Sequence, residues 1–364
     1  MTTFDPTPPA ANSAIPEATS SSSQGADVTT AAAAAAVSTK MTKKRKAKVA
    51  ALVIVMIIFA LIFGWYLFNR KPLTELPGLS TAKVPKYQFS IYGVNNPLGV
   101  AATATGDRIY VTQSNGDRTV KIFDRAGKPA GTLKPPKSTG EAHIPVYVAI
   151  NPTTQDVYVS DRSTAAIYVY DATGKFLRTF APKGNLGGKW APLGLAFGPD
   201  GTLYATDIRG LPAKSHRVLV FGPDGALVRS MGTPGQLSFP NGIVVDAQGN
   251  VEVSDSNNGR LVVFDPAGKM IATISRGVGD GDLGLPRGAA LDGAGRLFVA
   301  DTADHMVRVY TIEKSKATPT YVGSFGTEGQ LDGTFEYPNG VATDSRSRVY
   351  VTDRENNRLQ VWGY

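Results

Sequence analysis

The stretch YPNGVATDSRSRVYVTDRENNRLQVWGY, residues 337–364, contains a complete local pattern. A Pro-x-Gly sequence leads into a short apolar run, a polar turn follows, and an alternating run ends at Asp353. After a second polar turn, a third run begins at Arg358 and again alternates. Runs with a period of two, separated by short polar segments, are typical of antiparallel β-strands. The stretch therefore predicts three consecutive strands joined by tight turns.

The same pattern recurs along the chain and gives six copies. Each copy starts at a proline, and successive prolines lie 46 to 52 residues apart: Pro97, Pro145, Pro192, Pro240, Pro286 and Pro338. In earlier copies a fourth strand follows a Gly-containing turn, as in TGKFLRTF at residues 173–180. Four antiparallel strands repeated six times at this spacing predict an all-β, six-bladed β-propeller.

The last copy holds only three predicted strands. A stretch that looks like a fourth strand, KYQFSIYG at residues 86–93, precedes the first copy instead and is comparable to TYVGSFG at residues 320–326. An unpaired strand edge invites aggregation. We therefore expect residues 87–92 to pair with residues 358–364, which completes the sixth blade and closes the ring.

The copies resemble NHL repeats. The pattern P-x-G-[IV]-A-x-D-x-x-G-x-[VL]-[YF]-V-[AST]-D-x-x-[ND]-x-R-[VIL]-x-x-[FW] is nearly complete in the copies that begin at Phe239 and Tyr337. The resemblance covers residues 86–364 and implies a six-bladed propeller for this domain. It says little about chemistry, because such folds carry many functions.

Three segments precede the propeller. Residues 1–48 form a Ser-, Thr-, Ala- and Pro-rich tail that ends in a basic run, and this composition predicts disorder. Residues 49–68, VAALVIVMIIFALIFGWYLF, carry no charge and are long enough for one transmembrane helix. The cationic excess before this span predicts a single-pass cell-membrane protein with a cytoplasmic N-terminus and the propeller outside. A cleaved signal peptide is the alternative. Residues 69–85 are then a stalk.

Repeating acids end the second strand of five copies: Asp161, Asp207, Asp255, Asp301 and Asp353, with Gln113 in the first copy. A ring of acids could hold a metal, but one identical residue per blade is what a repeated turn requires, and Asp accepts turn N–H groups. Arg118, Arg217, Arg260 and Arg358 open the third strands nearby and are candidate partners for these acids. We predict a structural role for the acids.

No other pattern indicates catalysis. The chain has no cysteine and three histidines, and their positions do not predict a zinc site. No nucleophile elbow or phosphate-binding loop is present. We therefore predict no catalytic residues, no metal and no cofactor.

The residues that directly follow the six prolines should line one mouth of the central channel: Leu98, Val146, Leu193, Asn241, Arg287 and Asn339. Glycine stands one position later in five copies, and Tyr147 replaces it in the second. We predict that Asn241, Arg287, Asn339 and Tyr147 bind a ligand at this mouth. The long loops of the first three blades add a basic rim on the same face: Lys134, Lys137, Lys183, Lys189, Arg209 and Lys214.

These features favour a membrane-anchored binding, scaffold or sensor module for a protein or an anionic cell-surface polymer, because loops on a rigid scaffold usually carry binding. The alternative is a lactonase- or lyase-type enzyme with a channel site, since lactonases such as gluconolactonase are similar in fold. A third interpretation, nucleic-acid binding, is disfavoured because the basic excess is modest, aromatic residues are not interleaved with it, and the expected topology places the propeller outside the cell.

Overall fold

The computed structural model describes residues 46–61, 63, 84–136, 142–209, 216–277 and 280–364. The chain divides into two compact units, Met1–Gly64 and Trp65–Tyr364. In the first unit, residues 46–61 and residue 63 are helical. No helix within these described ranges has both the length and the apolar character that a membrane span requires. The rest of the predicted span, the rest of the tail and nearly all of the stalk lie outside the described residues.

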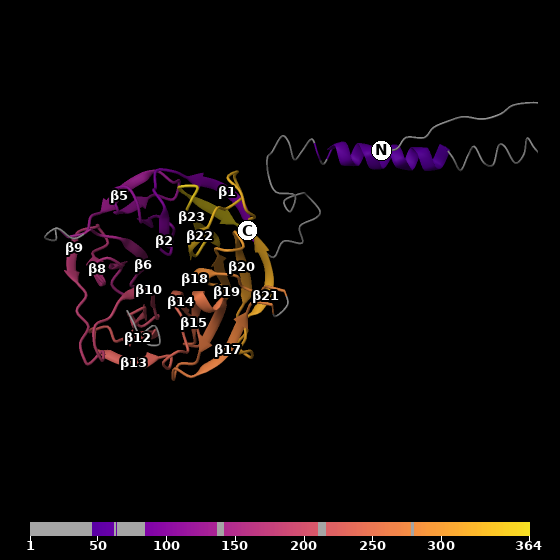
Figure 1. Cartoon of the computed structure of the whole chain (residues 1–364). Coiled ribbons are helices and arrows are strands. Elements are labelled where there is room, and N and C mark those ends of the chain that lie inside the picture. Colours follow the sequence, from indigo (N-terminus) through magenta and orange to yellow (C-terminus); the bar gives the residue numbers. More distant parts are fainter. Residues whose placement is uncertain (1–45, 62, 64–83, 137–141, 210–215, 278–279) are drawn as a thin grey trace, which may run out of the picture. The chain divides into compact units, whose positions relative to one another are not determined.

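The second unit consists of six four-stranded antiparallel sheets, which confirms the predicted number of blades. The innermost strands surround the centre of the ring and the outermost strands lie at its periphery (Figure 1). Blade 1 consists of β2 (Pro97–Ala102), β3 (Ile109–Gln113), β4 (Val120–Phe123) and β5 (Pro129–Leu133). Blade 2 consists of β6 (Pro145–Ile150), β7 (Val157–Asp161), β8 (Ala166–Tyr170) and β9 (Phe176–Thr179). Blade 3 consists of β10 (Pro192–Phe197), β11 (Leu203–Asp207), β12 (Arg217–Phe221) and β13 (Leu227–Met231).

The other three blades follow the same order, and a short 3-10 turn, η3 (Ser256–Asn258), follows the second strand of blade 4. Blade 4 consists of β14 (Pro240–Val245), β15 (Val251–Asp255), β16 (Arg260–Phe264) and β17 (Met270–Ser275). Blade 5 consists of β18 (Pro286–Leu291), β19 (Arg296–Asp301), β20 (Met306–Thr311) and β21 (Thr320–Phe325). Blade 6 consists of β22 (Pro338–Thr343), β23 (Arg348–Asp353), β24 (Arg358–Gly363) and β1 (Lys86–Ile91).

The sixth blade is completed by the first strand, as the sequence predicts. Strand β1 pairs antiparallel with β24, from Lys86 opposite Gly363 to Ile91 opposite Leu359. A β-bulge between Tyr87 and Phe89 interrupts the register. The Tyr87 ring packs edge-on against Trp362, with ring centroids 5.8 Å apart. The two ends of the propeller are thus joined within one sheet.

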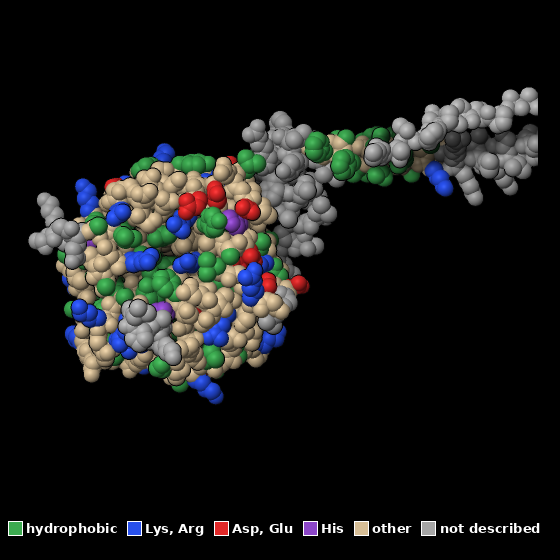
Figure 2. Space-filling view, in the orientation of Figure 1, with side chains coloured by type: hydrophobic (Ala, Val, Ile, Leu, Met, Phe, Trp, Pro, Cys, Tyr) green, Lys and Arg blue, Asp and Glu red, His purple; other side chains and the backbone are tan. Residues whose placement is uncertain are grey.

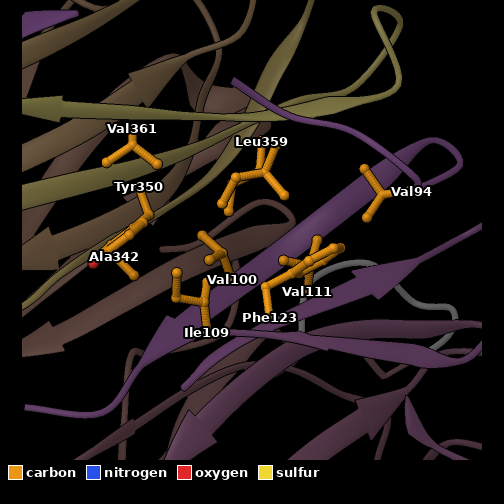
Figure 3. Close-up of a cluster of buried hydrophobic side chains, with 10 residues drawn as sticks. Val94, Val100, Ile109, Val111, Phe123, Ala342, Tyr350, Leu359 and Val361 are labelled. Carbon is orange, nitrogen blue, oxygen red and sulfur yellow. The ribbon is translucent and has the colours of Figure 1, made fainter. Parts of the chain in front are cut away.

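Apolar clusters fill the spaces between blades and bury the faces of the sheets. The cluster in Figure 3 joins blades 6 and 1: Ile91, Val94, Val100, Ile109, Val111, Phe123, Ala342, Tyr350, Leu359 and Val361. Burying apolar area of this kind is the main stabilising contribution in a β-protein without disulfides. Closure of the ring therefore depends on core packing as well as on strand pairing.

Hydroxyl groups on the second strands, or just after them in blades 4 and 5, tie each blade to the next. Thr112 Oγ1 donates to the Val146 carbonyl at 2.8 Å, Ser160 Oγ to Leu193 at 2.6 Å, and Thr352 Oγ1 crosses the seam to Leu98 at 2.9 Å. In blade 5 the matching residue is alanine, and Thr302 two positions later bonds the Pro338 carbonyl at 2.6 Å. These bonds hold the innermost strands at a fixed spacing around the axis.

The repeating acids have the structural role that we predict. Asp353 is buried, and its Oδ1 accepts the Glu336 N–H at 2.7 Å while its Oδ2 lies 2.7 Å from Arg358 Nε. Arg217 and Arg260 pair with their own acids at 3.0 and 2.7 Å. The expectation was wrong for Arg118, because blade 1 carries the neutral Gln113 and the described residues give Arg118 no ion pair.

One buried acid departs from the repeat. Glu252 on β15 occupies the position held by an aromatic residue in the other five blades, and it is 1 % exposed. Its Oε2 has no hydrogen-bond partner among the described residues. Burial, and then the nearby Asp246 carboxylate, raise the pKa of Glu252 well above its ordinary value of 4.5. The folded protein therefore holds this proton at pH values where the unfolded chain has lost it.

We expect Glu252→Gln to remove this pH dependence. Because the folded pKa is raised, stability falls as the pH rises above about 4.5, by about 1.4 kcal/mol for each unit between the folded and unfolded values. Urea unfolding at pH 5 and pH 8 should therefore show a larger gain from Glu252→Gln at pH 8. The exposed Glu328→Gln is the control. Equal gains at both pH values would contradict the assignment.

Candidate binding site at the channel mouth

All six residues that follow the blade prolines meet at one end of the channel. They line a cavity of about 290 Å³ together with five residues from neighbouring turns: Ser114, Ile144, Arg162, Phe239 and Arg354. Each innermost strand brings its second residue to this opening, so all six strands begin at this end of the channel. The predicted position of the mouth therefore agrees with the geometry, although the predicted ligand role is a separate matter.

The two halves of the cavity differ in chemistry. Blades 1 to 3 contribute an apolar wall that includes Leu98, Val146 and Leu193, whereas blades 4 to 6 contribute Asn241, Arg287 and Asn339. Lys and Arg side chains lie beside hydrophobic ones near the centre of the visible face (Figure 2). No described Asp or Glu lines the cavity. The site therefore combines an apolar surface with excess positive charge.

Arg162 and Arg354 are the cationic residues that our sequence reasoning missed. Each directly follows a repeating acid, Asp161 or Asp353, in the turn after the second strand. Ser114 holds the same position in blade 1 and also reaches the cavity. The signal was therefore present in the repeat: the residue after the acid is a mouth position in at least three blades.

Arg287 is the most deeply placed cation of the site. Its Nη1 donates to Asn241 Oδ1 at 3.4 Å, and its buried Nε has no partner among the described residues. Burial, together with repulsion from the Arg354 and Arg162 guanidinium groups, lowers the pKa of Arg287. A guanidinium nevertheless stays protonated in proteins. The site thus holds a buried positive charge with no described carboxylate to balance it.

Asn241 has a supporting role that differs from the predicted ligand contact. Its amide nitrogen donates to the Phe239 carbonyl at 3.0 Å and to Ser256 Oγ at 2.6 Å, which leaves its oxygen directed to Arg287. Both amide hydrogens are used, so Asn241 has none left to donate to a ligand. It instead fixes the position of the guanidinium.

Tyr147 lies behind the cavity wall and does not line the opening itself. It packs with Val146 and Leu193 in a small apolar cluster, and its hydroxyl has no hydrogen-bond partner among the described residues. Burial raises its pKa above the ordinary value, and the charge of Arg287 opposes this shift. The neutral hydroxyl is therefore a second buried donor close enough to Arg287 to interact electrostatically.

Strained backbone surrounds the opening. Asn96, Phe239 and Tyr337 each precede a blade proline and have φ values of 42°, 54° and 54°, in the left-handed region. Non-glycine residues in this region are uncommon and persist only where neighbours hold them. Each N–H is held by a side chain of the preceding blade: Asn357 Oδ1 at 2.8 Å for Asn96, His216 Nδ1 at 2.8 Å for Phe239, and His305 Nδ1 at 3.3 Å for Tyr337.

His216 makes one of these bonds dependent on pH. Burial lowers its pKa below 6.5, against the opposing effects of Asp207 and Asp255, and its Nδ1 must be unprotonated to accept the Phe239 N–H. As the pH falls through about 6.5, the unfolded chain binds a proton before the folded protein does. The contribution of His216 to stability is therefore present above this pH and is lost at lower pH.

We expect His216→Asn to reduce the loss of stability between pH 7 and pH 5. Asn357 shows that asparagine can accept the equivalent N–H in another blade, so the substitution should keep the bond without a titrating group. Urea unfolding of both proteins across this pH range measures the effect. If the two pH profiles run parallel, His216 does not contribute as we describe.

The basic rim does not form one patch with the cavity. Lys137 and Lys214 lie outside the described residues, and Lys134, Lys183, Lys189 and Arg209 do not line the cavity. Lys183 Nζ lies 3.5 Å from the Asp224 carboxylate in the β12–β13 turn. Such turns lie at the face opposite to the blade prolines, so the predicted placement of Lys183 on the mouth rim was wrong. Arg209 donates to the Leu186 and Gly187 carbonyls and thus holds its own loop.

Fold and cavity together define a six-bladed β-propeller with a candidate binding site at one end of its axis. The family pattern described as "NHL repeat" matches residues 237–264 and 335–362. NHL-repeat-containing protein 4 of Homo sapiens is 34 % identical over 115 residues, which cover 31 % of this chain and 85 % of that protein. The chain belongs to the NHL-repeat family.

Other relatives are much longer than the region they share with this chain. The chloroplastic protein SUPPRESSOR OF QUENCHING 1 of Arabidopsis thaliana is 24 % identical over 279 residues, 63 % of this chain and 26 % of that protein. Protein brain tumor of Drosophila melanogaster is 28 % identical over 131 residues, 35 % of this chain and 12 % of that protein. The chain therefore spans 26 % of the first of these relatives and 12 % of the second.

Solved structures with the same fold include two lyases. A streptogramin B lyase has a TM-score of 0.56 at 13 % identity, over 78 % of this chain and 99 % of that chain. Virginiamycin B lyase from Staphylococcus aureus has a TM-score of 0.54 at 13 % identity, over 77 % of this chain and all of that one. Identity this low shows a shared fold alone. Within the described residues, no group of three His, Asp or Glu side chains could hold a metal ion.

Proposed function

We propose that this protein is a membrane-anchored binding module whose propeller captures an anionic protein partner at the channel mouth. The observation that carries the proposal is the cavity with three arginines and no described acid in its lining. Arg354 already pairs with Glu355 at 3.3 Å, whereas Arg287 has a buried Nε and no described acid partner. Such a charge is costly, and a negatively charged group of a partner would offset that cost. The mouth is also where rigid strands present adjacent loops, which is the usual place for recognition.

A protein partner is favoured because the site has further features of an interaction surface. Tyr337 precedes the lining residue Asn339 by two positions, is 45 % exposed and packs at a tilt against His305 with ring centroids 4.6 Å apart. Tyrosine and arginine are enriched where protein interfaces gain most of their binding energy. An anionic cell-surface polymer shares the charge and stays a competing ligand.

The membrane part of the proposal rests on residues 49–68. This segment has no charged residue, and its described part is helical with exposed apolar side chains such as Leu52, Ile57 and Phe59. The basic run before it supports a cytoplasmic N-terminus. The chain has no cysteine, so single cysteines introduced in place of Ser22 and of the exposed Ala247 can be labelled with an impermeant reagent on intact cells. Labelling at residue 22 in place of 247 would overturn the orientation.

The experiment that tests the function is site-specific photocrosslinking in the full-length membrane protein. A benzoylphenylalanine replaces Tyr337 at the mouth, and the control places it at the exposed Ala247, in the β14–β15 turn on the opposite face. We expect a discrete protein adduct from position 337 that Arg287→Ala abolishes and Arg229→Ala leaves intact. Equal adducts from both positions, or an adduct that nuclease removes, would contradict the proposal.

A further inference from the structure

We propose that the mouth cavity takes one carboxylate on an apolar stem, namely the C-terminal residue of a protein chain that ends in an apolar side chain. The carboxylate would lie against Arg287, and the stem against Leu98, Val146 and Leu193. This inference rests on the proposed function, because it names the group that the captured partner inserts. It goes further in specifying the chemistry and size of that group.

Size is the first argument. A volume of about 290 Å³ is just below the range of roughly 300–1,000 Å³ for small-molecule pockets. It therefore suits a single residue and does not suit a polymer segment. A chain terminus brings one backbone connection into such a space, whereas an internal Asp or Glu brings two.

Charge is the second argument. Arg287 lines the cavity, and its buried Nε has no partner among the described residues. Asn241 holds the guanidinium from one side, so its remaining N–H groups are available to an acceptor. A carboxylate accepts several hydrogen bonds and matches the forked geometry of arginine. Arg162 adds positive charge at the opening, whereas the charge of Arg354 is partly balanced by Glu355 at 3.3 Å.

The apolar wall is the third argument, and it separates a carboxylate from a free inorganic anion. Val146 and Leu193 are 6 % and 1 % exposed, and Ile144 and Phe239 extend the same surface. Inorganic phosphate could use the arginines but would leave this wall without a partner. A terminal leucine, valine or isoleucine would place its side chain on the wall while its carboxylate faces Arg287. Capture of terminal carboxylates is a known mode of peptide recognition.

The test uses the full-length protein in detergent micelles and a fluorescein-labelled pentapeptide, Gly-Ser-Gly-Ser-Leu, with a free C-terminus. Fluorescence anisotropy measures its binding, and the same peptide with a C-terminal amide is the matched control. We expect the amide to bind at least tenfold more weakly, and a terminal Leu→Ser exchange to weaken binding several-fold. N-acetyl-leucine and inorganic phosphate serve as competitors.

Two variants probe the role of Arg287. Arg287→Ala should reduce affinity for the acid at least tenfold but leave the weak affinity for the amide unchanged, whereas Arg229→Ala on the outer strand β13 should affect neither. If Arg287→Ala fails to fold, the comparison of the acid peptide with the amide peptide still decides the matter.

Each outcome has a definite meaning. Selective binding of the acid peptide supports the inference. If N-acetyl-leucine then competes with equal affinity, the site is assigned to small apolar carboxylates. If N-acetyl-leucine competes much more weakly, the site is assigned to peptide termini. Equal binding of acid and amide, or stronger competition by phosphate than by N-acetyl-leucine, overturns it. If crosslinking at position 337 still depends on Arg287 while acid and amide bind alike, the proposed function stands and this inference fails. If the acid peptide binds selectively but no protein adduct forms, the inference about the carboxylate stands and the proposed capture of a protein partner fails.

Discussion

Gly194→Ala should destabilise the propeller by about 3 kcal/mol, although it adds a single methyl group. Gly194 follows Leu193 on the innermost strand of blade 3, and a Cβ at this position would overlap the carbonyl oxygen of Asn241 in blade 4. Its φ does not lie in the left-handed region, so the cost comes from contact between blades. Backbone atoms of a closed ring cannot move aside as a flexible side chain can, which places the substitution among the costlier overpacking changes.

Gly293→Ala is the matched control for this prediction. A Cβ there meets no atom within 4 Å and the φ is again outside the left-handed region, so the change should stay within about 0.5 kcal/mol. Urea unfolding of the two variants and the parent measures the difference. A Gly194→Ala protein as stable as Gly293→Ala would mean that the innermost strands are not in the close contact that the structure shows.

Arg358→Ala should have the second large effect, a loss of about 3–5 kcal/mol. Its buried guanidinium lies 2.7 Å from Asp353 Oδ2 and donates to the Leu331 and Thr334 carbonyls at 2.8 and 2.9 Å. Removing the arginine leaves a fully buried carboxylate without its cation and the Leu331 carbonyl without this donor, while the Thr334 carbonyl keeps only its bond from Gln360. Thermal or urea unfolding should therefore show a large shift.

Arg118→Ala is the matched variant, because Arg118 stands just before the third strand of blade 1, where Gln113 replaces the acid. It has no described ion pair, so truncation should cost less than about 1 kcal/mol. Comparable losses from the two variants would show that the pairing with the acid does not stabilise the blade.

The fold could be predicted from the sequence because the same pattern of strands and turns occurs six times along the chain. The spacing of the prolines gives the number of blades, and the fourth-strand pattern of residues 86–93 gives the closing strand. The residues after the prolines could also be placed, since the position of one innermost strand applies to all six. Repetition thus converts a weak local signal into a firm prediction of position.

Single departures from the repeat were harder to interpret. Arg162 and Arg354 follow the repeating acids, but whether such a residue reaches the cavity depends on the turn, and the corresponding Ile208 does not line it. The left-handed backbone conformation of Phe239 and Tyr337 depends on hydrogen-bond acceptors in the preceding blade, His216 and His305. Glu252 could have been noticed as the one acid among five aromatic residues, yet its burial without a partner required the structure.

Ring closure is the claim on which the mouth, its cavity and its proposed ligand all depend, and a disulfide tests it most directly. The chain has no cysteine, and Ser90 of β1 lies opposite Gln360 of β24. We expect Ser90→Cys combined with Gln360→Cys to form an intramolecular disulfide under mild oxidation, detected by mass spectrometry of the digested protein. Ser90→Cys with Val361→Cys should not, because a shift of one residue points the side chain to the other face. A bond in the second protein but not in the first would contradict the register, and a bond in neither would contradict the closed ring.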